Sequence, residues 1–192
     1  MVRLPLHAIF LLSVAIFTGC ATNEPQTSRL TSDDLIVASD KMVQSLGRDP
    51  IFAGRTPSSP PVVIITNKVE NLTDTIIPVG EQWMTIARVQ NGLPMQQFSQ
   101  SRNVKFVLPP ERRRLAASGG VEVPDGGGLV PTHVLAAQFT SSARTSQDKR
   151  GNVVGKQDYY YLEFKLTEVQ GREIVWSDAF EFKRQAAGLL ID

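Results

Sequence analysis

The side chain best suited to acid–base chemistry in this chain is His133, because the other of its two histidines, His7, lies in an apolar N-terminal run. A Ser/His/Asp triad would have to use His133, yet the sequence has no G-x-S-x-G segment that would present a nucleophile. Zinc needs three or four His, Cys or carboxylate ligands, so one histidine cannot hold the ion. We therefore expect no catalytic residue, no metal site and no cofactor.

Asp33 and Asp34 form a carboxylate pair that could also suggest acid–base chemistry, but a helix start explains both residues better. Thr31 and Asp34 have the spacing of a capping box, and acidic residues are favoured at the positive end of a helix dipole. An apolar stripe of helical spacing follows, and Gly47 is expected to end the helix. The stripe consists of Leu35, Ala38, Met42 and Leu46.

Cys20, the one cysteine of the chain, closes an apolar run that begins at Leu4. The run of about 14 residues is shorter than the roughly 20 residues that span a bilayer as a helix. A preceding cation, a short apolar run and small residues at its end are typical of a secretory signal. The segment Phe17-Thr18-Gly19-Cys20 is similar to a bacterial lipobox. That resemblance implies cleavage before Cys20 and a diacylglycerol, with its fatty acyl chains such as palmitate, on the cysteine thiol.

These signals divide the chain. We expect residues 1–19 to be a lipoprotein signal peptide and residues 20–30 to be the lipidated cysteine and a short tether. Residues 31–185 are expected to form one globular domain, and residues 186–192 a C-terminal tail. Ala21 follows the lipid site in place of the aspartate that retains lipoproteins in the inner membrane, so we expect the outer membrane, with the domain facing the periplasm.

The charge of the chain is balanced, with 20 Lys and Arg against 19 Asp and Glu. Removal of Arg3 with the signal peptide leaves 19 of each. A neutral chain argues against nucleic acid as a partner and against a strong electrostatic grip on anionic lipid. We expect the small basic clusters Arg112–Arg114 and Lys149–Arg150 to be solvated.

The middle of the chain alternates between helix and strand signals. The β-branched run that begins at Val62 predicts a central strand covered on both faces, and Asn71-Leu72-Thr73 is expected to close it as a turn. Helices are expected from Val79, from Met95 to about Ser101, and from Pro110 to Gly119. A short strand is expected at Val104–Val107.

The last third predicts three β segments, at Thr132–Ser142, Asp158–Thr167 and Glu173–Lys183. Alternation of period two with one apolar face indicates antiparallel strands packed on one side. The link between the first two segments is polar and is expected to be a mobile hairpin arm, and Gln170-Gly171 should turn the chain between the last two. We expect an α/β (α+β) fold with a single mixed β-sheet of about four to five strands, helices packed on it, and a C-terminal antiparallel β-meander.

Three consecutive tyrosines, Tyr159 to Tyr161, lie in the second of these β segments. Alternation places Tyr160 on one face and its two neighbours on the other. Aromatic side chains exposed on a sheet can anchor a partner protein, although cross-strand packing is at least as common. Tyr159 and Tyr161 are therefore candidate partner-binding residues.

The order of these segments resembles the LpoB-type family of lipoprotein activators of penicillin-binding proteins, with a core related to curli-assembly lipoproteins. The resemblance rests on DLIVASDKMVQSL, VVIITNKVENLTDT, RNVKFV and the terminal pair YYYLEFKLTEVQGREIVWSDAFEFKR. It implies a non-catalytic envelope lipoprotein that binds a class A penicillin-binding protein and stimulates peptidoglycan synthesis. A secretion-channel or envelope-assembly lipoprotein of the curli-assembly type is the alternative, and an enzyme acting through His133 is a third hypothesis.

Overall fold

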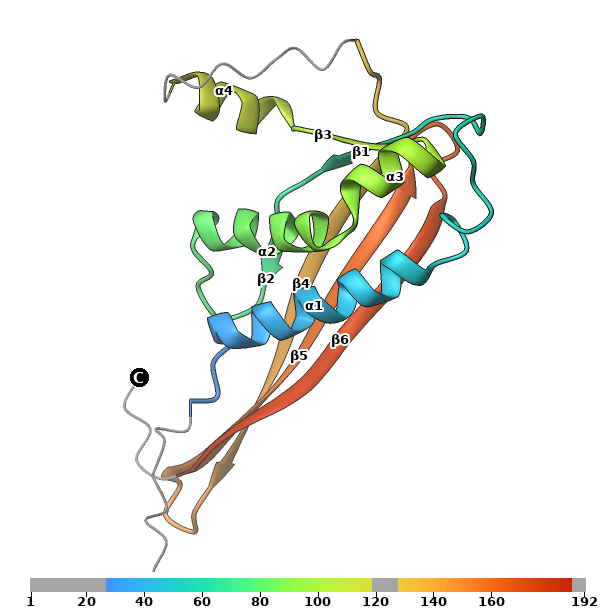
Figure 1. Ribbon diagram of the computed structural model, residues 1–192. Coiled ribbons are helices and arrows are strands. Elements are labelled where there is room, and N and C mark those ends of the chain that lie inside the picture. Colours follow the sequence, from blue (N-terminus) through green and yellow to red (C-terminus); the bar gives the residue numbers. More distant parts are fainter. Residues whose placement is uncertain (1–26, 119–127, 188–192) are drawn as a thin grey trace, which may run out of the picture.

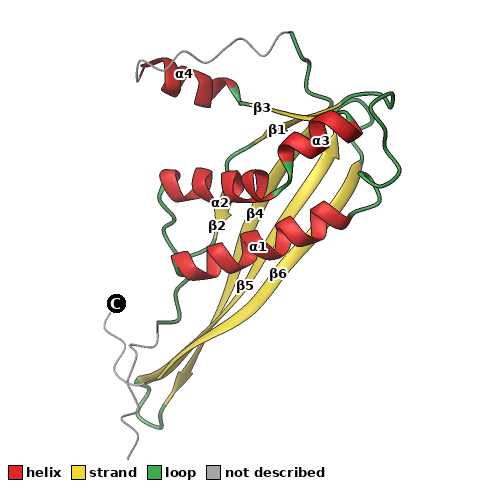
Figure 2. Ribbon diagram, in the orientation of Figure 1, coloured by secondary structure: helices red, strands yellow, loops and turns green. Residues whose placement is uncertain are grey.

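The computed structural model describes residues 27–118 and 128–187, and these form one sheet with helices on one side of it (Figure 1). Figure 2 shows the helices in front of strands that run on past them at one end. The elements, in chain order, are α1 (Ser32–Arg48), β1 (Val62–Thr66), β2 (Glu70–Leu72), α2 (Val79–Gly92), α3 (Met95–Arg102), β3 (Val104–Val107), α4 (Pro110–Ser118), β4 (His133–Gln147), β5 (Val153–Glu168) and β6 (Ile174–Ala187).

The sheet is mixed, with the strand order β3-β1-β4-β5-β6. β1 pairs in parallel with β3 and with the start of β4, and β2 pairs in parallel with β4 further along. β4, β5 and β6 form an antiparallel meander. The predicted mixed sheet and C-terminal meander are thus confirmed, and the sheet has six strands because β2 adds a short one.

The core lies between the meander and the helices. Alternate residues of β4, β5 and β6 share the helix-facing side through their registers, for example Leu135, Leu166 and Trp176. The predicted stripe on α1 packs there, and its four members are all buried. Phe139 and Phe164 add an edge-to-face aromatic pair with ring centroids 5.6 Å apart. Burial of this continuous apolar layer is the main stabilising contribution to the fold.

Two local expectations differ from the structure. Gly47 lies inside α1, which continues to Arg48 and has Asp49 as its C-cap. Asn71 and Leu72 pair with Phe139 and Thr140 as part of β2, so the predicted turn begins later. Pairing with β4 supplies hydrogen-bond partners that the local sequence does not reveal.

The link between the first two predicted β segments was expected to be a mobile arm, but most of it belongs to β4 and β5, and only residues 148–152 form the turn. β4 and β5 stay paired from His133↔Glu168 to Gln147↔Val153, beyond the helices that cover the body. The Asp148 carboxylate closes the turn, because it accepts hydrogen bonds from the backbone N–H groups of Arg150 and Asn152 at 2.8 and 2.9 Å. We call residues 143–157 the arm tip.

Candidate functional site

His133 is placed as a structural residue at the start of β4. Its side chain is 9% exposed, and the Thr132 hydroxyl lies 2.8 Å from its Nδ1. That hydroxyl also accepts a hydrogen bond from the Val63 N–H at 2.9 Å, so it helps to join β1 to the chain before β4. Burial lowers the pKa of His133, and the charge of Glu168 opposes that shift. The Thr132 hydroxyl beside His133 is thus already hydrogen-bonded to β1 and is not a free nucleophile.

Asp34 belongs to a helix cap at the start of α1, as the spacing predicts, and Asp33 is exposed in the first turn. The Thr31 N–H donates to Asp34 Oδ2 at 2.9 Å, and the Asp34 N–H donates to Thr31 Oγ1 at 3.4 Å. Arg184 on β6 also donates to Asp34 Oδ1 at 2.6 Å. The cap thus joins the first helix to the last strand.

Tyr160 fixes the beginning of the domain against the sheet. Its side chain is fully buried, and its hydroxyl accepts from the Leu30 N–H and donates to the Ser28 carbonyl, both at 3.1 Å. The Thr75 hydroxyl lies 3.1 Å away as a third partner. Ser28 and Leu30, which the sequence assigns to the tether, are themselves buried. This role was not predicted from the sequence; the feature that could have indicated it is a polar hydroxyl on an otherwise apolar strand face.

Tyr159 and Tyr161 lie on the opposite face of β5, as the alternation predicts, and both are partly exposed. By register Tyr159 lies beside Lys183, and Tyr161 beside Thr140 and Glu181. The Tyr159 hydroxyl donates to the Glu181 carboxylate, and this bond raises the pKa of Tyr159. The structure therefore brings the two rings together on one face.

This face of the meander is not covered by any of the described helices, so we call it the open face. It combines the two tyrosines with charges that are mostly paired. Lys165 Nζ lies 2.7 Å from Glu163 Oε2, and Gln138 donates to Glu70 Oε2 at 3.0 Å. The open face thus presents two aromatic rings beside charges that are paired with one another.

A second surface lies on the helical layer. A hollow of about 260 Å³ between α1 and α2 is lined by Ile36 and Met84, which are 41% and 70% exposed. Arg88 joins the two helices through bonds of 2.9 and 3.0 Å to the Asp40 carboxylate, and these bonds lower the pKa of Asp40. The hollow is apolar at its centre and charged at its rim.

A mixed groove of about 840 Å³ runs between β2, α2 and the start of α4, where Trp83 and Glu111 line it. The Arg112 guanidinium lies 5.5 Å from the centroid of the Trp83 ring, an attractive cation–π geometry. No group of three or more His, Cys, Asp or Glu side chains that could hold a metal occurs in residues 27–118 and 128–187.

Cys20 lies outside the described residues, as do residues 1–19 and 188–192. Within the part of the chain that the structure describes, every helix is too short or too polar to cross a bilayer.

Comparisons with known proteins agree on the fold alone. No protein-family model matches the chain, and no curated protein matches it. The chain is similar to the LpoB C-terminal domain from Escherichia coli, with 19% identity, a TM-score of 0.44, and coverage of 78% of this chain and 98% of that one. The same domain from Salmonella enterica gives 17% identity, a TM-score of 0.43, and coverage of 78% and 98%. Lipoprotein GNA1162 from Neisseria meningitidis has 12% identity and a TM-score of 0.36, and the match covers 65% of this chain and 84% of that one.

Proposed function

We propose that this protein is a non-catalytic envelope lipoprotein that binds and regulates a class A penicillin-binding protein. It is held in the outer membrane by lipid on Cys20 and faces the periplasm. The observation that carries the proposal is the open face, where Tyr159 and Tyr161 lie side by side on a meander whose other face is filled by the core.

The sequence supports the location. The lipobox-like segment that ends at Cys20 supports attachment of lipid there, and the segments that resemble LpoB-type activators support a peptidoglycan synthase as the partner. The surroundings of His133 give little support to an enzyme, because the hydroxyl beside it already joins two parts of the sheet.

The chemistry of the open face suits a protein partner. Tyrosine offers a large apolar ring with a polar end and loses little side-chain entropy on binding, which is why it is common among hot-spot residues. β5 is a central strand of the meander, so both rings are presented on a rigid backbone. The neighbouring pairs Glu163–Lys165 and Tyr159–Glu181 leave few unpaired charges to desolvate.

The test is binding of the purified mature chain, with Cys20→Ser to keep it soluble, to class A synthases from the same organism. Removal of both rings in Tyr159→Ala/Tyr161→Ala should weaken binding by at least about 30-fold, since a single hot-spot residue contributes roughly 2 kcal/mol or more. The rates of glycan polymerisation and peptide cross-linking by the synthase should rise with the wild-type domain and less with the variant.

The matched control is Ile36→Ala/Met84→Ala, which removes exposed apolar atoms from the hollow between α1 and α2. It should bind as the wild type does. Loss of binding in this variant alone would move the contact to the helical layer, and no binding to any class A synthase would refute the proposed partner. Mass spectrometry of the mature protein from cells tests the lipid separately, because an unmodified thiol on Cys20 would exclude the anchor.

An envelope-assembly or secretion-channel lipoprotein remains the second candidate, and the long β4–β5 hairpin is the observation that favours it. Copies joined through such hairpins would form a ring. Light scattering on the purified mature chain distinguishes the two, since a stable ring of many copies would favour assembly and a monomer would favour regulation of a synthase.

A further inference from the structure

The arm tip concentrates positive charge in a chain that is otherwise balanced. Between residues 143 and 157 the sequence has four cations and one anion, Asp148. Three of the cations are exposed and have no carboxylate partner among the described residues. They are Arg144, Lys149 and Arg150. The fourth, Lys156, pairs with Asp74 and Asp158 at 3.4 and 3.3 Å.

From the sequence alone, Lys149 and Arg150 are expected to be a small solvated cluster. Arg144 lies on the same hairpin, on β4 opposite Gln157 and five residues before Lys149, and the exposed Lys183 on β6 lies further along the same end of the sheet. The charges balance over the whole chain, but cations are in excess at the arm tip. An anionic surface attracts such a local excess of cations.

The same tip exposes two apolar side chains. Val153 and Val154 follow the turn at the start of β5, and they are 44% and 45% exposed. In the sequence, Gly151 and Asn152 separate them from Lys149 and Arg150. Apolar side chains next to cations are the combination that binds membrane interfaces, because the apolar atoms leave water while the cations meet lipid phosphates.

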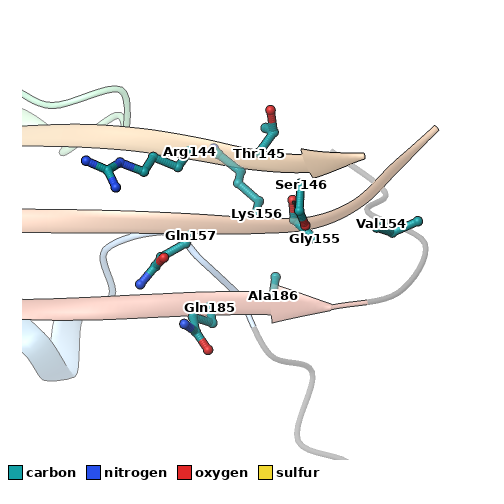
Figure 3. Close-up of a pocket in the computed structure, with 9 residues that line it drawn as sticks. All are labelled: Arg144, Thr145, Ser146, Val154, Gly155, Lys156, Gln157, Gln185 and Ala186. Carbon is teal, nitrogen blue, oxygen red and sulfur yellow. Dashed lines mark hydrogen bonds between the residues drawn. The ribbon is translucent and has the colours of Figure 1, made fainter. Parts of the chain in front are cut away.

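A shallow hollow of about 330 Å³ lies behind the tip. Figure 3 shows Arg144, Gln157 and Gln185 side by side across β4, β5 and β6, with their side chains on one side of the strands. Their registers place the three in one row. The row presents a guanidinium and two amides, which are donors suited to the oxygens of a phosphate group.

The position of the first described residues brings the tip to the same surface as the anchor. Ser28 and Leu30 are held by Tyr160 at the root of the arm. Cys20 is seven residues before Thr27, so an extended chain reaches at most about 25 Å from there. Tyr160 and Val153 are seven positions apart on β5, a rise of about 24 Å. The lipid on Cys20 and the arm tip can therefore meet one membrane together.

We propose that the arm tip docks on anionic phospholipid in the membrane that holds the lipidated Cys20. Lys149, Arg150 and Arg144 contact the phosphates, and Val153 and Val154 enter the interface. The inference rests on the proposed lipid anchor for its choice of membrane. It goes beyond that anchor, because the protein surface itself fixes how the domain stands on the bilayer.

The test uses the mature chain, residues 20–192, with Cys20→Ser so that no lipid is attached. The buried apolar cluster is built from residues between Leu30 and Trp176, so this chain retains its core. Sedimentation with vesicles of phosphatidylcholine and phosphatidylglycerol should carry the protein down, while vesicles of phosphatidylcholine alone should not. Added salt should release it, because exposed charges are screened.

One lysine or arginine at an anionic surface strengthens binding roughly five-fold, so Lys149→Gln/Arg150→Gln should weaken it about 30-fold. The matched control is Arg113→Gln/Arg114→Gln, which removes two exposed cations from α4, at the other end of the molecule from the arm (Figure 1). This control should bind vesicles as the parent chain does.

A fluorophore gives a second readout, because Cys20→Ser leaves no native thiol. An environment-sensitive dye on Val154→Cys should shift to the blue with anionic vesicles, and the same dye on Arg114→Cys should not. The proposal is overturned if the parent chain ignores anionic vesicles at low salt, or if both glutamine variants bind alike. Neither result depends on whether Cys20 is lipidated in cells or on which synthase is bound, so the two proposals fail separately.

Discussion

The hydroxyl of Tyr160 offers a test of how the domain holds its first residues. Tyr160→Phe keeps the ring, which stacks on Phe182 with centroids 5.3 Å apart, and removes one oxygen. That oxygen bonds the Leu30 N–H and the Ser28 carbonyl in a buried site. After the change the Leu30 N–H keeps only the Thr75 hydroxyl at 3.4 Å, and the Ser28 carbonyl loses its bond from the phenol.

Each net hydrogen bond contributes about 0.5–1.5 kcal/mol, and a buried group left without a partner costs about 1–3 kcal/mol. We therefore expect Tyr160→Phe to lower the free energy of unfolding by about 2 kcal/mol. For a domain of this size that corresponds to a fall in Tm of about 4–8 °C. Urea unfolding of the mature chain with Cys20→Ser measures the change, and hydrogen exchange at the Leu30 amide reports it locally.

Tyr161→Phe is the matched control, because it removes the same atom from the open face, where the hydroxyl of Tyr161 has no protein partner among the described residues. It should change the free energy of unfolding by less than about 0.5 kcal/mol. Equal stability of the two variants, with unchanged exchange at Leu30, would refute the conclusion that the Tyr160 hydroxyl attaches the start of the domain to the sheet.

Three further changes have expected outcomes in urea unfolding. Lys156→Met should lower the free energy of unfolding by about 3 kcal/mol, because it leaves the buried Asp158 carboxylate without its cation. Lys165→Met breaks a more exposed pair and should lower it by under about 1 kcal/mol. Equal losses in the two variants would contradict this reasoning. Burial lowers the pKa of His133 below its ordinary value of 6.5. As the pH drops, the unfolded chain therefore binds the proton first, and the free energy of unfolding falls as the pH drops below about 6.5. His133→Gln should reduce this pH dependence, and an unchanged profile of stability against pH would contradict the argument. Thr31→Ala removes the side-chain cap of α1 and should cost about 1 kcal/mol, with no loss expected if the cap contributes nothing.

Periodicity predicted the elements whose apolar residues face a core. The stripe on α1 and the alternation in β5 and β6 arise because buried positions are apolar and recur at the period of a helix or a strand. The break between α2 and α3 was also predictable, since Pro94 lies between them as the residue that precedes α3. The same reasoning placed Tyr159 and Tyr161 on the face opposite Tyr160, as the structure shows.

Pairing between backbones was not predictable from the same signals. β2 and the arm tip show no alternation of apolar and polar residues that marks a strand, and they are strands because β2 pairs with β4 and the two halves of the arm tip pair with each other. The role of Tyr160 depends on Ser28, 132 residues earlier in the chain. The turn after β5 shows the same limit at short range: Gly171 suggested where the chain reverses, while Arg172 takes the left-handed conformation with φ +55°. Whether Tyr159 and Tyr161 bind a partner stays a prediction.

The cross-strand partner of Ala187 is Gly155, so the last described residue of β6 lies at the arm, the same end at which Ser28 enters the body. A fluorescent protein fused behind β6 would therefore sit beside the end of the domain where Ser28 enters, and would crowd that end sterically. A reporter inserted near α4, at the far end in Figure 1, would leave that end clear. Imaging or display experiments on this protein should place their cargo there.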